Sequence, residues 1–130
     1  MLQKELAERI KAEPSNRIYG RISVVLQTFF TIKYHFQISR KVFKPQPKVD
    51  SAIISFSRKK NSIKYPDIYQ NIIKKAFQNR RKKLKNNLNF INDDSDFKIY
   101  MNLRAEDLHY KDYVKIYDKY VLNNKISILK

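Results

Sequence analysis

A proline-rich segment carries an aromatic side chain that could contact a flat ligand. Phe43 precedes Pro45 and Pro47, and each proline fixes its own φ angle and lacks a backbone N–H. Because the residue before a proline is also driven toward extended geometry, we expect residues 43–50, called the arm below, to be a stiff loop. An aromatic ring on a rigid, basic loop suits stacking against a planar group. The alternative is that Phe43 fills the core, as most aromatic side chains do.

A run of basic residues is the second candidate for chemistry. Five of the six residues from Arg80 to Lys85, called the basic segment below, are Arg or Lys. Such a cluster contacts phosphates without reading bases, and on an RNA duplex it responds to backbone shape. The alternative is a solvated helix face. The candidate RNA-binding residues, with two earlier lysines that extend the patch, are Arg80, Arg81, Lys82, Lys83, Lys85, Lys74 and Lys75.

The overall charge also indicates a polyanionic partner. The chain has 28 basic and 12 acidic residues, which give a net charge of +16. Nucleic acid is the first expectation and a membrane surface the second. A codon bias that inflates Lys, Asn and Ile is the alternative cause. The charge is uneven, however, with +8 in residues 51–95 against +2 in residues 96–130, which favours a localised binding face.

Side chains for metal binding or covalent catalysis are sparse. The chain has no cysteine, and its two histidines are His35 and His109. His35 falls on the polar side of a predicted strand and is expected to be solvated. Asp93, Asp94 and Asp96 lack the glycine and the distal glutamate of a calcium loop, so a solvated turn is expected. We therefore expect no metal site.

The chain lacks signals for membrane insertion. No run of about 18 apolar residues is present, and the first residues contain no apolar signal-peptide core. We therefore expect no membrane partner and a cytoplasmic location.

The first part of the chain, residues 1–57, predicts a mixed fold. The apolar residues of 32–38 alternate with polar ones, which is typical of a half-buried strand. A second strand follows the arm, so an antiparallel pair with a long, stiff connection is expected. The expected elements are a short strand leading into a helical turn (1–12), a helix (19–31) and two strands (32–38 and 49–57). The side chains expected on one face of the first long strand are Ile32, Tyr34, Phe36 and Ile38, opposite Lys33, His35 and Gln37.

The second part is expected to be entirely helical. Residues 58–64 form a basic linker and the best domain boundary, and residues 65–130 follow it as a second domain. Arg104 and Glu106 are two apart and do not face each other on a helix, so a salt bridge that anchors a turn is expected there. The expected elements are a helix from Asp67 to Phe77, a helix from Arg80 to Leu88, a short helix that Ser95 or Asp96 caps and that runs through Tyr100, a helical turn at 106–110 and a helix at 111–123. The fold class is therefore α+β, with an all-α domain after a small sheet.

Five blocks, in order, resemble one known family. The segment Phe43–Ala52 resembles Phe-x-Pro-x-Pro-Lys-Val-Asp-Ser-Ala of the rRNA adenine methyltransferases. The other blocks resemble MLQKEVAxR, YGRLSV, AFxxRRKxL and RAExL, and begin at Met1, Tyr19, Ala76 and Arg104. Each block is weak alone, but together they indicate the small-subunit (16S-type) rRNA adenine dimethyltransferases, also called KsgA-type, from Met1 to about Tyr120.

The resemblance implies a fold, a reaction and roles for residues. Residues 1–57 correspond to the end of a Rossmann-like methyltransferase domain, and 65–130 to an rRNA-binding domain. The complete enzymes transfer methyl groups from S-adenosylmethionine to two adjacent adenosines near the 3′ end of small-subunit rRNA, so the partner is that rRNA or a pre-30S-type ribosomal particle. Phe43 would stack on the target adenine, and Arg80, Arg81 and Lys82 would dock the RNA. A monomer is expected.

The cofactor-binding part of the family is missing from this sequence. Neither its glycine-rich loop nor its Asn-Leu-Pro-Tyr motif is present, and Gly20 is the single glycine. The chain therefore resembles a C-terminal half, which we expect to bind no cofactor and to be inactive alone. The alternatives are a macrolide-resistance-type methylase of large-subunit rRNA, a non-catalytic RNA-binding or ribosome-assembly module, and a general DNA-binding protein.

Overall fold

The chain divides into two compact units in a computed structural model that describes residues 1–88 and 98–123. Unit 1 comprises Met1–Asn61 and unit 2 comprises Ser62–Lys130. The boundary between them falls within residues 58–64, the basic linker expected from the sequence.

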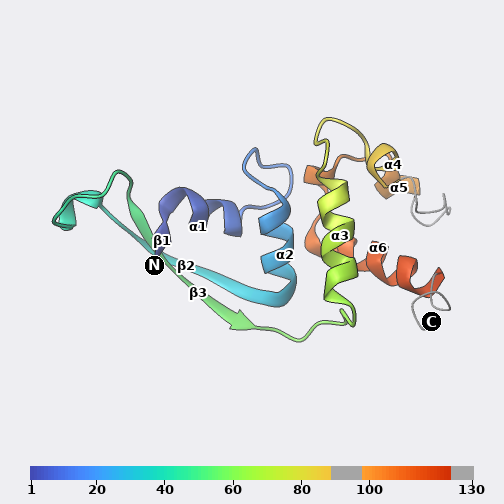
Figure 1. The fold of residues 1–130 in the computed structure, drawn as a ribbon, viewed down its shortest axis with the longest axis horizontal. Coiled ribbons are helices and arrows are strands. Elements are labelled where there is room, and N and C mark those ends of the chain that lie inside the picture. Colours follow the sequence, from blue (N-terminus) through green and yellow to red (C-terminus); the bar gives the residue numbers. More distant parts are fainter. Residues whose placement is uncertain (89–97, 124–130) are drawn as a thin grey trace. The chain divides into compact units, whose positions relative to one another are not determined.

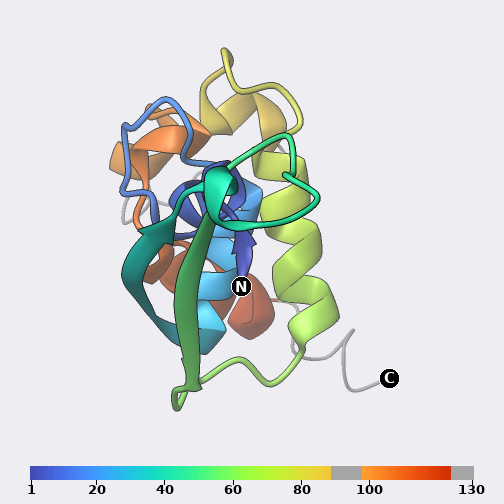
Figure 2. The ribbon, with the colours of Figure 1, turned by 90° about the vertical axis from the view of Figure 1, so that its left-hand side faces the viewer.

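Unit 1 contains a three-stranded antiparallel sheet in the order β1-β3-β2 (Figures 1 and 2). The predicted α+β class, with a helix and an antiparallel strand pair, is confirmed. The elements are β1 (Leu2–Gln3), α1 (Lys4–Lys11), α2 (Arg21–Phe29), β2 (Phe30–Ile38), the 3-10 turn η1 (Arg40–Val42) and β3 (Ser51–Arg58).

A β-bulge corrects the simple alternation predicted for β2. The register with β3 shifts between Tyr34 and Phe36, so that Tyr34 pairs with Ile54 whereas Phe36 pairs with Ile53. Because neighbouring residues of a strand point to opposite faces, this one-residue shift places Phe36 on the face opposite Tyr34. Phe36 is accordingly 56% exposed. The sequence pattern fails here because an inserted strand residue has no local signature in the chain.

The core of unit 1 lies between this sheet and the two helices. Ala7 and Ile10 of α1 pack against Ala52 and Ile54 of β3, and all four side chains are buried. The partly buried side chains around this cluster are Leu2, Leu6, Ile22, Leu26, Ile32 and Tyr34. Apolar side chains of both α1 and α2 therefore pack in the core against the sheet.

Polar side chains of α2 tie it to the end of α1. The hydroxyl of Ser23 accepts a hydrogen bond from the N–H of Gly20 at 3.1 Å and donates one to the carbonyl of Arg9. The amide of Gln27 donates to the carbonyls of Ile10 and Ala12, each at 2.8 Å. The carbonyls of Ile10 and Ala12 lie at and just after the last turn of α1, where carbonyls have no intrahelical partner, whereas the carbonyl of Arg9 also accepts the N–H of Ala12 at 3.3 Å. These hydrogen bonds explain why polar residues lie on a helix with a partly buried surface.

Ser23→Ala should destabilise unit 1, because it leaves the carbonyl of Arg9 and the N–H of Gly20 without this hydroxyl. A buried polar group that loses its partner costs about 1–3 kcal/mol. Ser23 is fully buried, whereas Ser57 is exposed, so Ser57→Ala is the matched control and should change stability by less than about 0.5 kcal/mol. Urea unfolding of both variants measures the difference. Equal stabilities would contradict this account of the contact.

Unit 2 is helical in its described part, as predicted, apart from one isolated β-bridge between Lys83 and Arg104. The elements are α3 (Pro66–Ala76), α4 (Leu84–Asn87), α5 (Lys98–Met101), the 3-10 turn η3 (Ala105–Asp107) and α6 (Tyr110–Asn123) (Figure 1). The turn predicted at 106–110 is shorter and begins one residue earlier. The predicted Ser95 or Asp96 cap and the Asp93–Asp96 turn lie outside the described residues.

The helix predicted from Arg80 to Leu88 is wrong over its first half, since α4 begins only at Leu84. The amide of Asn87 donates to the carbonyls of Ala76 and Asn79, at 3.1 and 2.9 Å, where α3 ends. The N–H of Leu84 donates instead to the carbonyl of Leu103, at 2.8 Å. These tertiary contacts favour a turn at residues 79–83, because asparagine side chains offer the backbone partners outside a helix.

Tyrosines make the core between α3 and α6. The rings of Tyr69 and Tyr117 meet edge to face, with centroids 5.5 Å apart, and the Tyr117 hydroxyl accepts a hydrogen bond from the N–H of Tyr65 at 2.8 Å. The hydroxyl of Tyr113 donates to the carbonyl of Ala105 at 2.6 Å. Tyr113, Ile116 and Tyr117 are buried, so these three side chains make the core-facing side of α6.

Candidate nucleic-acid interface

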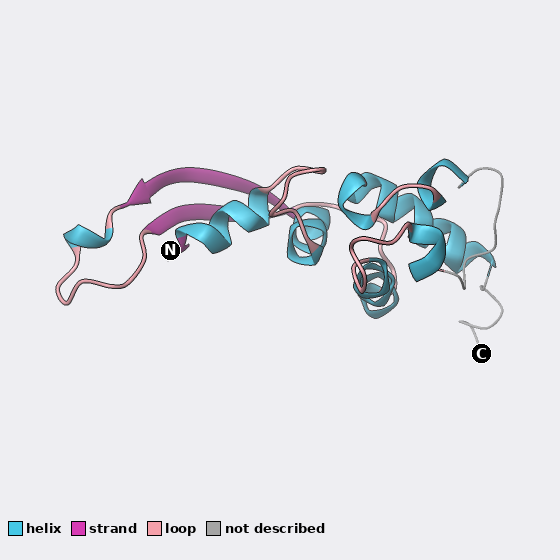
Figure 3. Ribbon diagram, turned by 90° about the horizontal axis from the view of Figure 1, so that it is seen from above, coloured by secondary structure: helices cyan, strands magenta, loops and turns pink. Residues whose placement is uncertain are grey.

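The arm projects beyond the ends of β2 and β3, as Figure 3 shows. The turn η1 leads into it, and the N–H of Phe43 donates to the carbonyl of Arg40 at 3.3 Å. Residues 43–50 contain no helix or strand, as two prolines predict. The arm therefore begins with a defined turn and continues as an irregular loop.

Phe43 lies in this loop and outside the core cluster of unit 1. Its side chain is half-buried, and the neighbouring Val42 is 70% exposed. Three exposed lysines lie near these two apolar residues: Lys41 in η1, and Lys44 and Lys48 in the arm. Val42 was not among the residues predicted from the sequence, because a lone valine beside an aromatic residue gives no signal of exposure.

Asp50 links the two ends of the arm. One carboxylate oxygen accepts a hydrogen bond from the N–H of Arg40 at 2.9 Å, and the other accepts one from the amide of Gln37 at 3.1 Å. The guanidinium of Arg40 lies 3.6 Å from the same carboxylate and donates to the carbonyl of Lys48 at 2.7 Å. The hydrogen bond from the Arg40 N–H holds the pKa of Asp50 below its ordinary value of 3.8, helped by the charges of Arg40 and Lys4 and by Gln37.

The carboxyl of Asp50 should titrate below pH 3.8. Its pKa is lowered in the folded chain, so its contribution is present above the unfolded pKa and is lost as the pH falls through the folded one. A carbon-13 NMR titration of the carboxyl group measures this midpoint directly. Arg40→Ala should raise it only in part, since the backbone N–H remains. A midpoint at or above 3.8 in the unaltered chain would contradict the described contacts.

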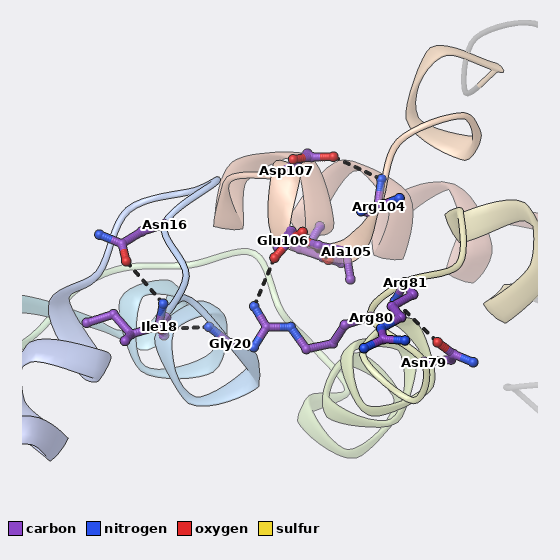
Figure 4. A network of polar contacts seen from close by, with 12 residues as sticks. Asn16, Ile18, Gly20, Asn79, Arg80, Arg81, Arg104, Ala105, Glu106 and Asp107 are labelled. Atoms are coloured by element: carbon purple, nitrogen blue, oxygen red, sulfur yellow. Dashed lines mark hydrogen bonds and ion pairs between the residues drawn. The ribbon is translucent and has the colours of Figure 1, made fainter.

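The basic segment of unit 2 contains one arginine that is already paired. Figure 4 shows Arg80 reaching Glu106, with a nitrogen–oxygen distance of 3.1 Å. The side chains of Arg80 and Glu106 are 41% and 28% exposed. The N–H of Arg81 donates to the side chain of Asn79 at 3.2 Å, which leaves the guanidinium of Arg81 on the exposed side of the turn.

The other candidate RNA-binding residues of unit 2 are lysines, and all of them are exposed. Lys82, Lys83 and Lys85 follow Arg81 in and just after the turn, and Lys74 and Lys75 lie on α3. The turn predicted around Arg104 and Glu106 is present, but its anchors differ from the expected pair. The N–H of Arg104 donates to Asp107 at 3.1 Å, and Glu106 pairs with Arg80 (Figure 4). Residues so far apart in sequence give no local signal of this pairing.

The described residues offer neither a cluster for a metal ion nor a membrane-spanning helix. Among residues 1–88 and 98–123, no cluster of three His, Cys, Asp or Glu side chains could hold a metal ion. His35 is exposed on β2, where its ring hydrogen-bonds the hydroxyl of Ser55 at 2.8 Å. Within the same described ranges, no helix has the length and apolar character needed to cross a membrane.

Solved structures define the class of this fold. A dimethyladenosine transferase from Plasmodium falciparum superposes with a TM-score of 0.78 at 22% identity, over 95% of this chain and 55% of that protein. The 23S rRNA methyltransferase ErmE superposes with a TM-score of 0.63 at 18% identity, over 90% and 51%. The chain therefore shares the fold of about half of each of these two proteins.

The sequence identifies the family within this class. Residues 1–121 match the family model of ribosomal RNA adenine dimethylase, and the chain belongs to that family. The ribosomal RNA small subunit methyltransferase A of Francisella tularensis subsp. novicida is 43% identical over 123 residues, which are 89% of this chain and 47% of the relative. The protein of the same description from Sulfurihydrogenibium sp. is 40% identical over 120 residues, or 90% and 45%. The chain thus spans about half the length of the curated relatives it matches.

Proposed function

We propose that this chain forms the RNA-docking and base-clamping portion of a small-subunit rRNA adenine dimethyltransferase. The complete enzyme transfers methyl groups from S-adenosylmethionine to the exocyclic amines of two adjacent adenosines near the 3′ end of that rRNA. The observation that carries the proposal is the arm, which presents Phe43 outside the core on a loop tied at both ends. Family membership supplies the reaction class.

The arm suits the handling of a base taken out of its stack. An enzyme that modifies a base must extrude it and hold it between apolar or aromatic faces. Phe43 is half-buried and the preceding Val42 is 70% exposed, so part of the aromatic ring remains accessible to a planar base. The opposite face of the base is contacted by residues of the part of the enzyme that this chain does not contain.

The basic segment suits contact with RNA phosphates. Arg81, Lys82, Lys83 and Lys85 are exposed, and such cations release counterions when they neutralise phosphates. Arg80 is paired with Glu106, so it adds less net positive charge to this surface than its neighbours do, and its guanidinium is held in one orientation. Lys74 and Lys75 extend the same positive surface along α3.

We assign no site for S-adenosylmethionine to the described residues. Gly20 is the single glycine, and it begins α2 in an extended conformation with φ of −155° rather than forming a phosphate- or nucleoside-binding loop. We therefore assign the binding of the methyl donor to the remainder of the enzyme.

Phe43→Ala should lower methylation about ten- to a hundredfold in a chimaera that joins this chain to the N-terminal half of a family relative. Base–aromatic stacking contributes about 1–3 kcal/mol, and each 1.4 kcal/mol is about tenfold in rate. Phe43→Tyr and Phe43→Trp should retain more activity than Phe43→Leu. Methylation of small-subunit rRNA with a radiolabelled methyl donor measures the rates.

Melting temperatures of the same variants separate a clamp from a core residue. A core role predicts a loss of about 3–5 kcal/mol for Phe43→Ala and a nearly silent Phe43→Leu. A large stability loss with an unchanged rate per folded molecule would refute the clamp.

Removing two exposed cations should flatten the salt dependence of RNA binding. Arg81→Ala combined with Lys82→Ala should reduce the slope of log K against log salt by about one to two units, because each phosphate contact contributes about 0.9. Arg80→Ala should change it less, owing to the ion pair with Glu106. Titration of a structured RNA between 50 and 200 mM salt, roughly the range in which such contacts are lost, measures the slopes.

The matched control removes the same charge elsewhere in unit 2. Lys111 and Lys115 are exposed on α6, in the part of the chain that is nearly neutral. Their double replacement by alanine should leave the slope almost unchanged. Equal slopes for the two double variants would mean that the basic segment is only a solvated surface.

A further inference from the structure

We propose that Asp50 is a positioning residue that fixes the direction in which the arm presents Phe43. The inference rests on the proposed base-clamping function. It assigns to the aspartate of the proline-rich segment, and to Arg40 and Gln37 that contact it, the task of holding the loop rather than of touching RNA.

The sequence around Asp50 makes a direct role in RNA binding unfavourable. Asp50 is the only acidic residue between Glu13 and Asp67, in a stretch rich in Lys and Arg. A carboxylate beside phosphates would repel them, and like charges in contact are destabilising. Its presence at the base of a basic loop therefore calls for an intramolecular role.

The contacts of Asp50 close the loop where the strand ladder stops. The last pair of the β2–β3 ladder is Ile38 with Ser51, so residues 39–50 lie outside it. Asp50 precedes this pair, and its carbonyl accepts a hydrogen bond from the N–H of Lys4 at 2.9 Å, which attaches it to the start of α1. The carboxylate thus extends the attachment from the helix and sheet to the first turn of the loop.

A short chain of hydrogen bonds leads from Asp50 to Phe43. The carboxylate accepts the N–H of Arg40 at 2.9 Å, and the carbonyl of Arg40 accepts the N–H of Phe43 at 3.3 Å. The guanidinium of Arg40 meanwhile donates to the carbonyl of Lys48, at 2.7 Å, on the returning side of the arm. One carboxylate and one guanidinium therefore hold the outgoing and returning backbone together.

These contacts act on mobility more than on stability. The side chains of Arg40 and Asp50 are 46% and 23% exposed, and a solvent-exposed ion pair adds little to the free energy of unfolding. Ordering the loop in advance lowers the entropy lost when a base stacks on Phe43. Loss of Asp50 should therefore weaken base stacking while leaving the melting temperature nearly unchanged.

The chain offers a direct probe, because it contains no tryptophan. Phe43→Trp introduces a single tryptophan into the arm, which can be excited selectively beside the nine tyrosines of the chain. Its time-resolved anisotropy reports the motion of the loop without any RNA. Adding Asp50→Ala should enlarge the fast component of depolarisation about twofold. Asp50→Asn, which keeps an oxygen acceptor for the Arg40 N–H, should have a smaller effect. Glu13→Gln removes an exposed carboxylate outside the arm and is the control with no expected change.

Quenching of the same tryptophan by a single-stranded oligoadenylate tests the functional consequence. Asp50→Ala should weaken the stacking component about three- to tenfold, with an unchanged slope against salt. Faster arm motion and weaker stacking at an unaltered melting temperature support the proposal. Unchanged arm motion in Asp50→Ala overturns it, as does a melting temperature that falls in parallel with the motion, since Asp50 would then be a general stabiliser.

The failure of the two proposals can be told apart. If oligoadenylate does not quench the introduced tryptophan even with Asp50 present, the base-clamping function fails, while the anisotropy still decides the role of Asp50. Amide hydrogen exchange of residues 40–43 in the chain with native Phe43 also tests whether Asp50 orders the arm, without the introduced tryptophan. Protection that is identical with and without Asp50 would overturn the positioning role.

Discussion

The hydrogen-bonded ladder between β2 and β3 is the constraint on which unit 1 depends. It runs from the pair Phe30–Arg58 to the pair Ile38–Ser51, and it holds the two ends of the arm side by side. The bulge within it decides which side chains face α1 and α2 and which face outward, because a one-residue shift reverses the two faces. Ile32 and Tyr34 of β2, which precede the bulge, pack against the core of Ala7, Ile10, Ala52 and Ile54, whereas Phe36, which follows it, is exposed. Strand pairing therefore fixes where the arm leaves the sheet. The two ends of the arm are held by the hydrogen bonds of the ladder.

The two units handle their excess of positive charge in a similar way. In each, one of the few carboxylates holds an arginine next to the residues proposed to meet RNA: Asp50 with Arg40 in unit 1, and Glu106 with Arg80 in unit 2. Both pairs are partly exposed, so neither is a large source of stability. Their effect is geometric, because a paired guanidinium keeps one orientation beside lysines that are exposed to solvent. The acidic residues thus shape a basic surface without cancelling its charge.

The chain belongs to the rRNA adenine dimethylase family and corresponds to part of its relatives. The chain matches the family model over residues 1–121 but spans about half of each curated relative. Within that span, each unit has its own core and its own candidate surface: the arm in unit 1 and the basic segment in unit 2. The proposed division between base stacking by the arm and phosphate binding by the basic segment has a chemical basis, since stacking needs an apolar plane and phosphates need cations.

The sequence by itself determined the fold class, the family and most elements, because these depend on local signals. The prolines at 45 and 47 exclude a helix in the arm, alternation marks the strands, and the spacing of Tyr113, Ile116 and Tyr117 marks one face of the last helix. Tertiary structure alone decided the bulge that exposes Phe36, the turn that replaces the first half of the helix predicted at 80–88, and the partners of Asp50 and Glu106. Each of these depends on groups far apart in the chain, such as the amide of Asn87 at the end of α3 or the guanidinium of Arg80 beside Glu106. Local propensity contributes only a fraction of a kcal/mol per residue, roughly, and contacts that satisfy several backbone groups at once outweigh it.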